Sequence, residues 1–301
     1  MGMPKRVPGV PPADDFNNNN NDFTNIEGLV WAGDALYVSE INPGKAAQNS
    51  PPPSRVLKIT ADDQVSIAIP VDSGTNGLAI DAAGDLFGAV HKDGSISKLS
   101  LTGGAAVPVV SMFMGSRFDS PNDLAFHTNG TLYFTDPDWQ APTPKPQAAT
   151  RAYRVPPGGQ PEMIEVLSQP NGVSLSAKQE FLYIGGGQLK RYPVMADGSL
   201  GPGTNFHMTD AATSTDGMVV DCGDNVYAAG ANCNDGCQGK GATIFSKAGA
   251  IIGTVPVSEL GSGTNVAFGG ADHKTLYISG QGTGQQKGLF KVQMNVPGFP
   301  Y

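Results

Sequence analysis

The segment NDLAFHTNGTLYFT, Asn122 to Thr135, recurs five more times along the chain in varied form. Each copy has a polar residue, a short apolar run, a turn and a second apolar run that usually contains Leu and Tyr or Phe. The other copies are EGLVWAGDALYVS from Glu27, NGLAIDAAGDLFGA from Asn76, NGVSLSAKQEFLYIG from Asn171, DGMVVDCGDNVYAA from Asp216 and NVAFGGADHKTLYIS from Asn265. Their first residues are 49, 46, 49, 45 and 49 positions apart, which is the length of one four-stranded propeller blade.

Six copies predict an all-β protein, a six-bladed β-propeller with four antiparallel strands in each blade. Each copy supplies the first two strands of a blade, and apolar segments such as 55–60 and 95–100 follow as third strands. The last blade runs out of chain after its third strand, at 288–294, so its outermost strand is expected from the N-terminal segment before Glu27. This closure would leave no unpaired sheet edge. Residues 1–22, with five asparagines at 17–21, are expected to be a flexible linker, and residues 23–301 a single propeller domain.

Composition supports this class and excludes several partners. The 301 residues include 40 glycines and 24 prolines but only 15% charged residues, which is typical of short strands joined by tight turns. A net charge of −8 disfavours nucleic acid and anionic membranes as partners. No run of about 20 apolar residues predicts membrane insertion. We expect a monomer, periplasmic or extracellular with its leader removed, or alternatively cytoplasmic.

Three cysteines, Cys222, Cys233 and Cys237, lie close together in the sequence. One disulfide with one free thiol and three reduced thiols both remain open. A zinc knuckle is disfavoured, because no fourth ligand stands at zinc-like spacing and Asp235 lies between the last two cysteines.

The first residue of every copy precedes the same strand, so symmetry places these six residues around one mouth of the central channel. All six side chains carry a carbonyl or carboxylate oxygen, whereas histidine and cysteine are missing from the set. Such residues also cap turns, but six matched positions favour a shared role. Several oxygens with two formal negative charges suit a hard divalent cation such as Ca²⁺. The set is Glu27, Asn76, Asn122, Asn171, Asp216 and Asn265.

Several strings resemble the senescence marker protein, gluconolactonase and luciferin-regenerating enzyme family of six-bladed propellers, and most closely its bacterial gluconolactonases. They are EGLVW at Glu27, SPNDLAF at Ser120, LYFTDP at Leu132, QPNGVSLS at Gln169, STDGMVVD at Ser214, TNVAFGG at Thr264 and NVPGFPY from Asn295. The resemblance implies a divalent cation, usually Ca²⁺ and alternatively Zn²⁺, Mn²⁺ or Mg²⁺. It also implies that Glu27, Asn171 and Asp216 are metal ligands and that Asn122 is a further ligand or a substrate contact.

One position departs from the family pattern. Ser120 stands where the senescence-marker branch has an arginine that helps to hold a sugar acid, so the resemblance does not imply that substrate here.

Two further residues are candidates for contacts with substrate. His91 follows the second strand of the second blade near the expected channel mouth, and a neutral imidazole there can bind substrate or move a proton. Trp139 follows Asp136 on a loop of the third blade, where its ring can stack on a sugar, although Asp136-Pro137 also fits an ordinary turn.

The function that these features predict is a metal-dependent lactonase, acting on a small-molecule lactone. The cation would polarise the ester carbonyl, and Asp216 is the predicted general base, because asparagine accepts no proton and the resemblance makes Glu27 an anchoring ligand. Phosphotriester or fluorophosphate hydrolysis is an alternative. A non-catalytic propeller that binds calcium for stability and a partner at its rim is another.

Overall fold

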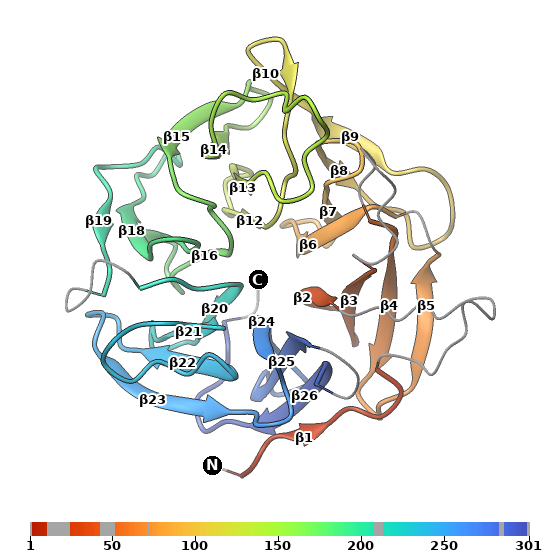
Figure 1. The fold of residues 1–301 in the computed structure, drawn as a ribbon, viewed down its shortest axis with the longest axis vertical. Helices are drawn as coiled ribbons and strands as arrows, with labels where there is room; N and C mark the ends of the chain where they lie inside the picture. Colours follow the sequence, from red (N-terminus) through yellow and green to blue (C-terminus); the bar gives the residue numbers. More distant parts are fainter. Residues whose placement is uncertain are drawn as a thin grey trace.

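The structure, a computed structural model, describes residues 2–10, 25–42, 52–70, 73–207, 213–282 and 286–299. Within these ranges the chain forms six four-stranded antiparallel sheets, arranged as blades around a central axis (Figure 1). From the axis outwards, blades 1 to 3 consist of β2 (Asn25–Ala32), β3 (Ala35–Ile41), β4 (Ser54–Thr60) and β5 (Val65–Ile69); β6 (Thr75–Ile80), β7 (Leu86–Val90), β8 (Ser95–Lys98) and β9 (Val107–Val110); and β12 (Leu124–Phe126), β13 (Leu132–Asp136), β14 (Arg151–Val155) and β15 (Glu162–Val166).

The second half of the ring repeats this order. Blades 4 to 6 consist of β16 (Val173–Leu175), β17 (Phe181–Ile184), β18 (Lys190–Pro193) and β19 (Thr204–Asn205); β20 (Met218–Val220), β21 (Val226–Ala229), β22 (Gly241–Phe245) and β23 (Ile251–Pro256); and β24 (Ser262–Gly269), β25 (Thr275–Gln281), β26 (Gly288–Gln293) and β1 (Lys5–Arg6). A small hairpin of β10 (Met112–Phe113) and β11 (Ser116–Arg117) follows blade 2. The described residues form no helix, and so none that is long and apolar enough to cross a bilayer. The predicted all-β six-bladed propeller is confirmed.

The ring closes in blade 6, where the N-terminal strand β1 joins the last long strand of the chain, β26. Strand β1 pairs antiparallel with β26, so that Lys5 lies opposite Lys291 and Arg6 opposite Phe290 (Figure 1). The Arg6 guanidinium also lies over the Phe290 ring, 4.6 Å from its centroid. The N-terminal segment therefore supplies the outermost strand, as expected from the repeat. Residues 11–24, with the asparagine run of the expected linker, lie outside the described residues.

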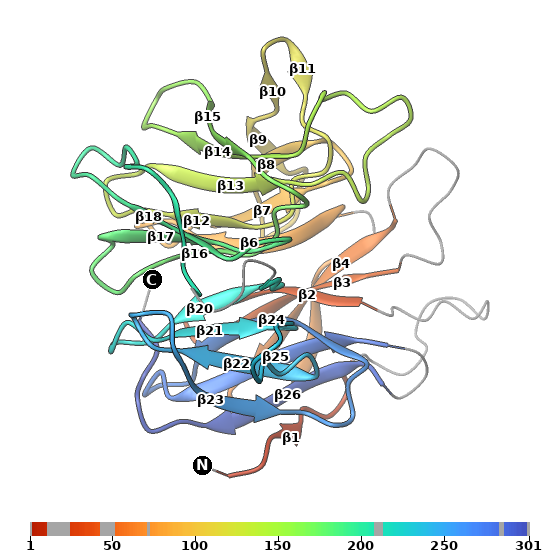
Figure 2. The same ribbon diagram turned by 60° about the vertical axis from the view of Figure 1, so that its left-hand side comes forward.

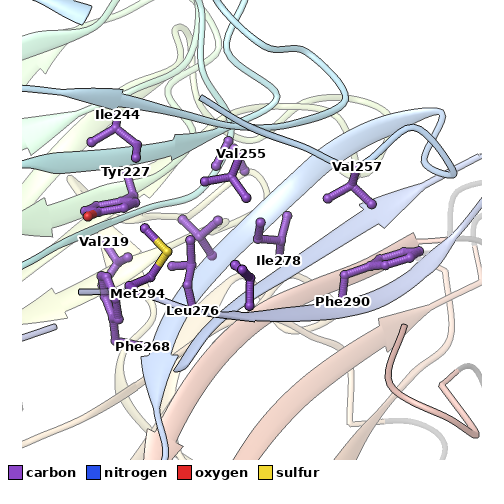
Figure 3. Close-up of a cluster of buried hydrophobic side chains, with 14 of the residues drawn as sticks. Val219, Tyr227, Ile244, Val255, Val257, Phe268, Leu276, Ile278, Phe290 and Met294 are labelled. Atoms are coloured by element: carbon purple, nitrogen blue, oxygen red, sulfur yellow. The ribbon is translucent and has the colours of Figure 1, made fainter. Parts of the chain in front are cut away.

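The core is divided among the six contacts between neighbouring blades, with one buried apolar cluster at each contact. Strand β25 shows how one strand serves two clusters. Leu276 and Ile278 pack toward blade 5, whereas Tyr277 between them packs toward blade 1, because successive side chains of a strand face opposite sides. Figure 3 shows the cluster between blades 5 and 6. Burial of each large apolar side chain stabilises the ring by roughly 1.5–3 kcal/mol.

The turned view shows the blades as stacked, twisted sheets whose inner strands converge on the channel (Figure 2). In blades 1, 2 and 6 the pairing of the inner strand shifts register near its start, between Glu27 and Val30, Thr75 and Leu78, and Gly263 and Val266. Such bulges bend the strand and re-aim a side chain. They fall where the repeat begins with its polar residue.

Candidate metal centre

The first polar residue of each repeat stands at one end of an inner strand. Glu27, Asn76 and Asn265 lie in the bulged regions of β2, β6 and β24, and Asn122, Asn171 and Asp216 lie two residues before β12, β16 and β20. The six residues therefore occupy equivalent positions in the six blades. The six side chains, here called the oxygen ring, belong to one end of the channel.

Glycine follows four of the six members of the oxygen ring, and the space around it explains why. A Cβ atom on Gly28 would lie 1.9 Å from the Asn76 carbonyl oxygen, and one on Gly77 would lie 2.5 Å from the Asn122 carbonyl oxygen. The Gly77 amide in turn donates to that Asn122 oxygen at 2.6 Å. These glycines therefore allow neighbouring inner strands to approach closely, which a side chain would prevent.

Blade 3 breaks this pattern, because Asp123 follows Asn122 where four blades have glycine and blade 6 has valine. The Asp123 carboxylate accepts hydrogen bonds from the backbone amides of Leu124 (2.9 Å) and, across the blade boundary, Val173 (3.0 Å). Its side chain is 8% exposed. Asp123 is not among the residues predicted from the sequence, although a carboxylate in a column of glycines is a signal that the six aligned repeats contain.

Burial raises the pKa of all three carboxylates, and the charge of Asp123 adds to the rise at Glu27 and Asp216. Burial, followed by the charges of Asp216 and Asp123, raises the pKa of Glu27 well above its usual range. Burial and the charge of Asp123 raise the pKa of Asp216 to about 8, and burial raises the pKa of Asp123 to about 7. No lysine or arginine of the described chain is among the groups that act on these three pKa values. Three acids are thus held together without a compensating cationic side chain.

The asparagines orient two of these acids. The Asn265 Oδ1 atom accepts the Val266 amide at 2.7 Å, so its amide nitrogen is left to donate to Glu27, with which it is hydrogen-bonded. Asn171 is hydrogen-bonded to Asp216. In that pair Asn171 donates from its nitrogen and keeps its Oδ1 atom for another partner.

Solvent reaches the oxygen ring unevenly. Glu27, Asn76, Asn122 and Asn265 are buried, at 7%, 4%, 6% and 7% exposure, whereas Asn171 and Asp216 keep intermediate exposure. Among the described residues, the accessible side of the ring therefore belongs to blades 4 and 5.

The chemistry of this donor set fits a hard divalent cation. Carboxylate and amide oxygens are the donors that Ca²⁺ and Mg²⁺ prefer, and a bound cation removes the repulsion among acids whose pKa values are raised. The structure brings together Glu27, Asn171 and Asp216 of the predicted ligands and adds Asp123 beside them. Asn122 precedes Asp123 in the same turn.

His91 lies directly after β7 and is fully buried. Its Nε2 atom is 3.3 Å from the Pro52 carbonyl oxygen, which only accepts, so Nε2 carries the proton and Nδ1 is left as an acceptor. Burial lowers the pKa of His91 to about 4, and the imidazole is therefore neutral near pH 7.

The loop that carries Trp139 is bound to the segment before Asn122. The Asp136 carboxylate accepts the backbone amides of Asp119 (3.0 Å) and Ser120 (2.8 Å), and the Ser120 hydroxyl donates to the Pro137 carbonyl oxygen at 2.8 Å. Asp136 thus has a structural role in this turn, and the buried Ser120 points into protein. The Trp139 side chain is 49% exposed.

The channel beyond the oxygen ring is largely apolar. A cavity of about 120 Å³ lies there and reaches the ring, since Asp123 and Asn265 line it together with inner-strand side chains such as Leu29, Leu78 and Ile80. Phe299, at the end of the described residues, also lines it. The segment that carries Phe299 is fixed by hydrogen bonds from the Cys222 amide to Pro297 (2.9 Å) and from the Gly298 amide to His273 (2.7 Å).

Comparisons with known proteins agree with this fold. Residues 26–281 match the model of the SMP-30/gluconolactonase/LRE-like region, and the chain belongs to this family. A gluconolactonase from Zymomonas mobilis is 31% identical over a match of 179 residues, and the match covers 52% of this chain and 48% of the relative. The chain thus matches about half the length of that curated relative.

Two solved structures share the architecture. A gluconolactonase from Xanthomonas campestris superposes with a TM-score of 0.74 and 26% identity, over 92% of this chain and 87% of that one. The calcium-binding protein regucalcin from Agrobacterium tumefaciens gives a TM-score of 0.69 at 16% identity, over 93% and 96% of the two chains, and shows the likeness of fold alone.

Proposed function

We propose that this protein is a divalent-metal-dependent lactonase that opens a small cyclic ester with water. The observation that carries the proposal is the group of carboxylates Glu27, Asp123 and Asp216, which lacks a compensating cationic side chain among the described residues. Glu27 and Asp123 are buried, whereas Asp216 keeps accessible surface. The gluconolactonases among its relatives support the choice of a lactone as substrate. Calcium is the first candidate ion, because all the donors are oxygens.

In this proposal Glu27, Asn122, Asn171 and Asp216 hold the ion. The ion, when bound, polarises the ester carbonyl and stabilises the negative charge that develops on its oxygen. Glu27 is the anchoring ligand, since it is buried and hydrogen-bonded to Asn25 and Asn265. Asp123 contributes negative charge, while one of its oxygens holds the Leu124 amide and the other the Val173 amide of blade 4.

Asp216 has two tasks that its two carboxylate oxygens divide between them. One oxygen would hold the ion, and the other would accept a proton from the attacking water, as a general base does. Asp216 suits the second task better than Glu27, because it retains exposed surface where substrate and water arrive. Asn122, His91 and Trp139 are proposed contacts of the substrate.

A panel of substrates with the metal removed and restored tests the function. The chain is freed of metal, reloaded separately with Ca²⁺, Zn²⁺, Mn²⁺ or Mg²⁺, and assayed on sugar and aliphatic lactones and on phosphotriesters. We expect turnover of at least one lactone that chelation abolishes and reloading restores. Asp34→Asn is a matched control, because Asp34 is an exposed acid in the hairpin turn between β2 and β3.

Other outcomes would identify the alternatives. Metal-dependent turnover of phosphotriesters without lactones would assign the site to phosphotriester hydrolysis. Stabilisation by the ion without turnover of either panel would indicate a non-catalytic calcium-bound propeller.

A further inference from the structure

A second cluster of metal-binding side chains lies outside the channel, where blades 4 and 5 meet. The ligand atoms of His207, Cys233 and Asp235 all lie within 4.8 Å of one another. His207 follows β19 at the outer edge of blade 4, whereas Cys233 and Asp235 lie in the loop between β21 and β22 of blade 5. The fold therefore supplies the histidine that the local sequence around the cysteines lacks.

The imidazole of His207 is held in the orientation of a metal ligand. Its Nδ1 atom is 2.6 Å from the Gly249 carbonyl oxygen, which only accepts, so Nδ1 carries the proton. Histidines that bind metals commonly donate this second N–H to a backbone carbonyl. The other nitrogen, Nε2, lies 3.0 and 3.1 Å from the two Asp235 carboxylate oxygens. The ring itself is 3% exposed and packs on Phe245.

The cysteine loop is fixed at both ends independently of its sulfurs. Cys233 and Cys237 form a disulfide, which settles the pairing that the sequence left open, and Cys222 is free. Before the loop, Asn232 exchanges two backbone hydrogen bonds with Ser214, at 3.0 and 2.9 Å. After it, the Gln238 amide donates to the Thr243 hydroxyl at 2.7 Å.

We propose that, once this disulfide is reduced, Cys233, Cys237, His207 and Asp235 together bind one Zn²⁺ ion. The three residues between the cysteines fall within the usual spacing of zinc-binding pairs, and zinc takes four N, S and O ligands in a tetrahedron. A dithiol supplies two electrons and two protons to the disulfide and is itself oxidised to a disulfide. Zinc then displaces the two protons from the resulting thiols. The loop exchanges a covalent link for a metal link.

The cysteine loop begins beside a member of the oxygen ring. The loop leaves β21 at Gly230, where a Cβ atom would lie 3.5 Å from the Asp216 Cβ atom. A zinc ion would join the outer edge of blade 4 to this loop of blade 5. Because the ion binds the folded chain, we expect it to raise the melting temperature of the reduced protein.

Cobalt is the probe that separates this site from the channel. The full chain, freed of metal and reduced with a phosphine that is then removed anaerobically, is titrated with Co²⁺ and followed by absorption. A thiolate-to-cobalt charge-transfer band reports only ions bound to cysteine, whereas the oxygen ring has no sulfur ligand. We expect the band to saturate at one ion per reduced chain, to be displaced by Zn²⁺, and to be absent from the oxidised chain.

Matched variants decide which residues bind. Cys222→Ser removes the remaining cysteine and should keep the band, whereas Cys233→Ser should abolish it. Asp235→Asn should weaken cobalt binding by at least about tenfold, as changes even in the groups that support metal ligands do. Its side chain is 38% exposed, so this variant is expected to fold even if His207→Gln does not. A reduced wild-type chain without the band, or unchanged affinity in Asp235→Asn, would overturn the proposal.

Discussion

The two ends of the channel use the same six inner strands for opposite purposes. Strand β6 illustrates this, since Asn76 near its start belongs to the oxygen ring and Ile80 at its end lines the apolar cavity. Burial of apolar surface at one end stabilises the fold, whereas burial of Glu27, Asp123 and Asp216 at the other end opposes it, as their raised pKa values indicate. Groups with perturbed pKa values cluster at functional sites, which supports the proposal that this end binds a metal ion.

The largest effect is expected from Asp216→Asn at the oxygen ring, because this variant keeps an oxygen ligand but removes the proposed base. We expect kcat on the best lactone to fall by about a hundredfold or more, in line with general-base contributions. Calorimetric titration should show that the ion still binds. Asp34→Asn is the control, and a variant that binds the ion with nearly normal turnover would place the base elsewhere, with His91→Gln as the next substitution.

Loss of a metal ligand should weaken metal binding by at least about tenfold, because mutation of residues that only hydrogen-bond to the ligands already weakens it by about this factor. Glu27→Gln and Asn171→Ala are the variants. Asn76→Ala is the matched control within the oxygen ring, because Asn76 is outside the proposed ligand set. The Kd of Ca²⁺ measures the effect. Equal weakening by Asn76→Ala and Asn171→Ala would contradict the proposed ligand set.

Removal of the ion should also lower the melting temperature of the wild-type chain. An ion present at 100 times its Kd stabilises the folded state by about 2.7 kcal/mol, and chelation removes this contribution. Thermal unfolding with and without chelator measures it. If chelation changes neither melting nor turnover, the chain does not depend on a metal.

The fold and much of the site could be predicted from the sequence because propeller symmetry repeats the same local pattern. The spacing that identifies the copies beginning at Glu27 and Asp216 can be read from the sequence without knowing which residues are in contact. The aligned repeats mark Asp123 as an exception, but only the structure shows its role: its carboxylate reaches Val173 of the next blade and lies beside two other acids. The partner of Cys233 could not be chosen either, since no repeat fixes the geometry of that loop.

The stability of the metal-free chain should depend on pH because of the oxygen ring. Asp216, with a pKa of about 8 against an ordinary value of 3.8, and Asp123, with a pKa of about 7, bind protons in the folded state that the unfolded state has released. The free energy of unfolding of the metal-free chain therefore falls as pH rises from about 5 to about 8. With the ion bound these charges are compensated, so the difference in melting temperature between the two forms should widen over this range.

Thermal unfolding of the dialysed and Ca²⁺-loaded chains across this pH range measures the effect. Asp216→Asn is the informative comparison, because it removes one of the titrating groups and should flatten the dependence in the metal-free form. A metal-free melting temperature that rises over the same interval would contradict the assignment.

The smallest expected effect is at the apolar end, and it tests whether the two ends are separate. Ile80→Val removes one methyl group from the wall of the cavity and should cost about 0.5–1.5 kcal/mol of stability, since the surrounding strands relax only in part. Ile67→Val is the matched control: Ile67 lies in the outermost strand of blade 1 with 48% exposure, and its change should be smaller. Denaturant unfolding measures both. Neither variant should alter kcat or the Kd of Ca²⁺, because Ile80 stands at the far end of β6 from the oxygen ring. A tenfold loss of activity in Ile80→Val alone would mean that the substrate extends into the cavity and that the division between a stabilising end and a binding end is wrong.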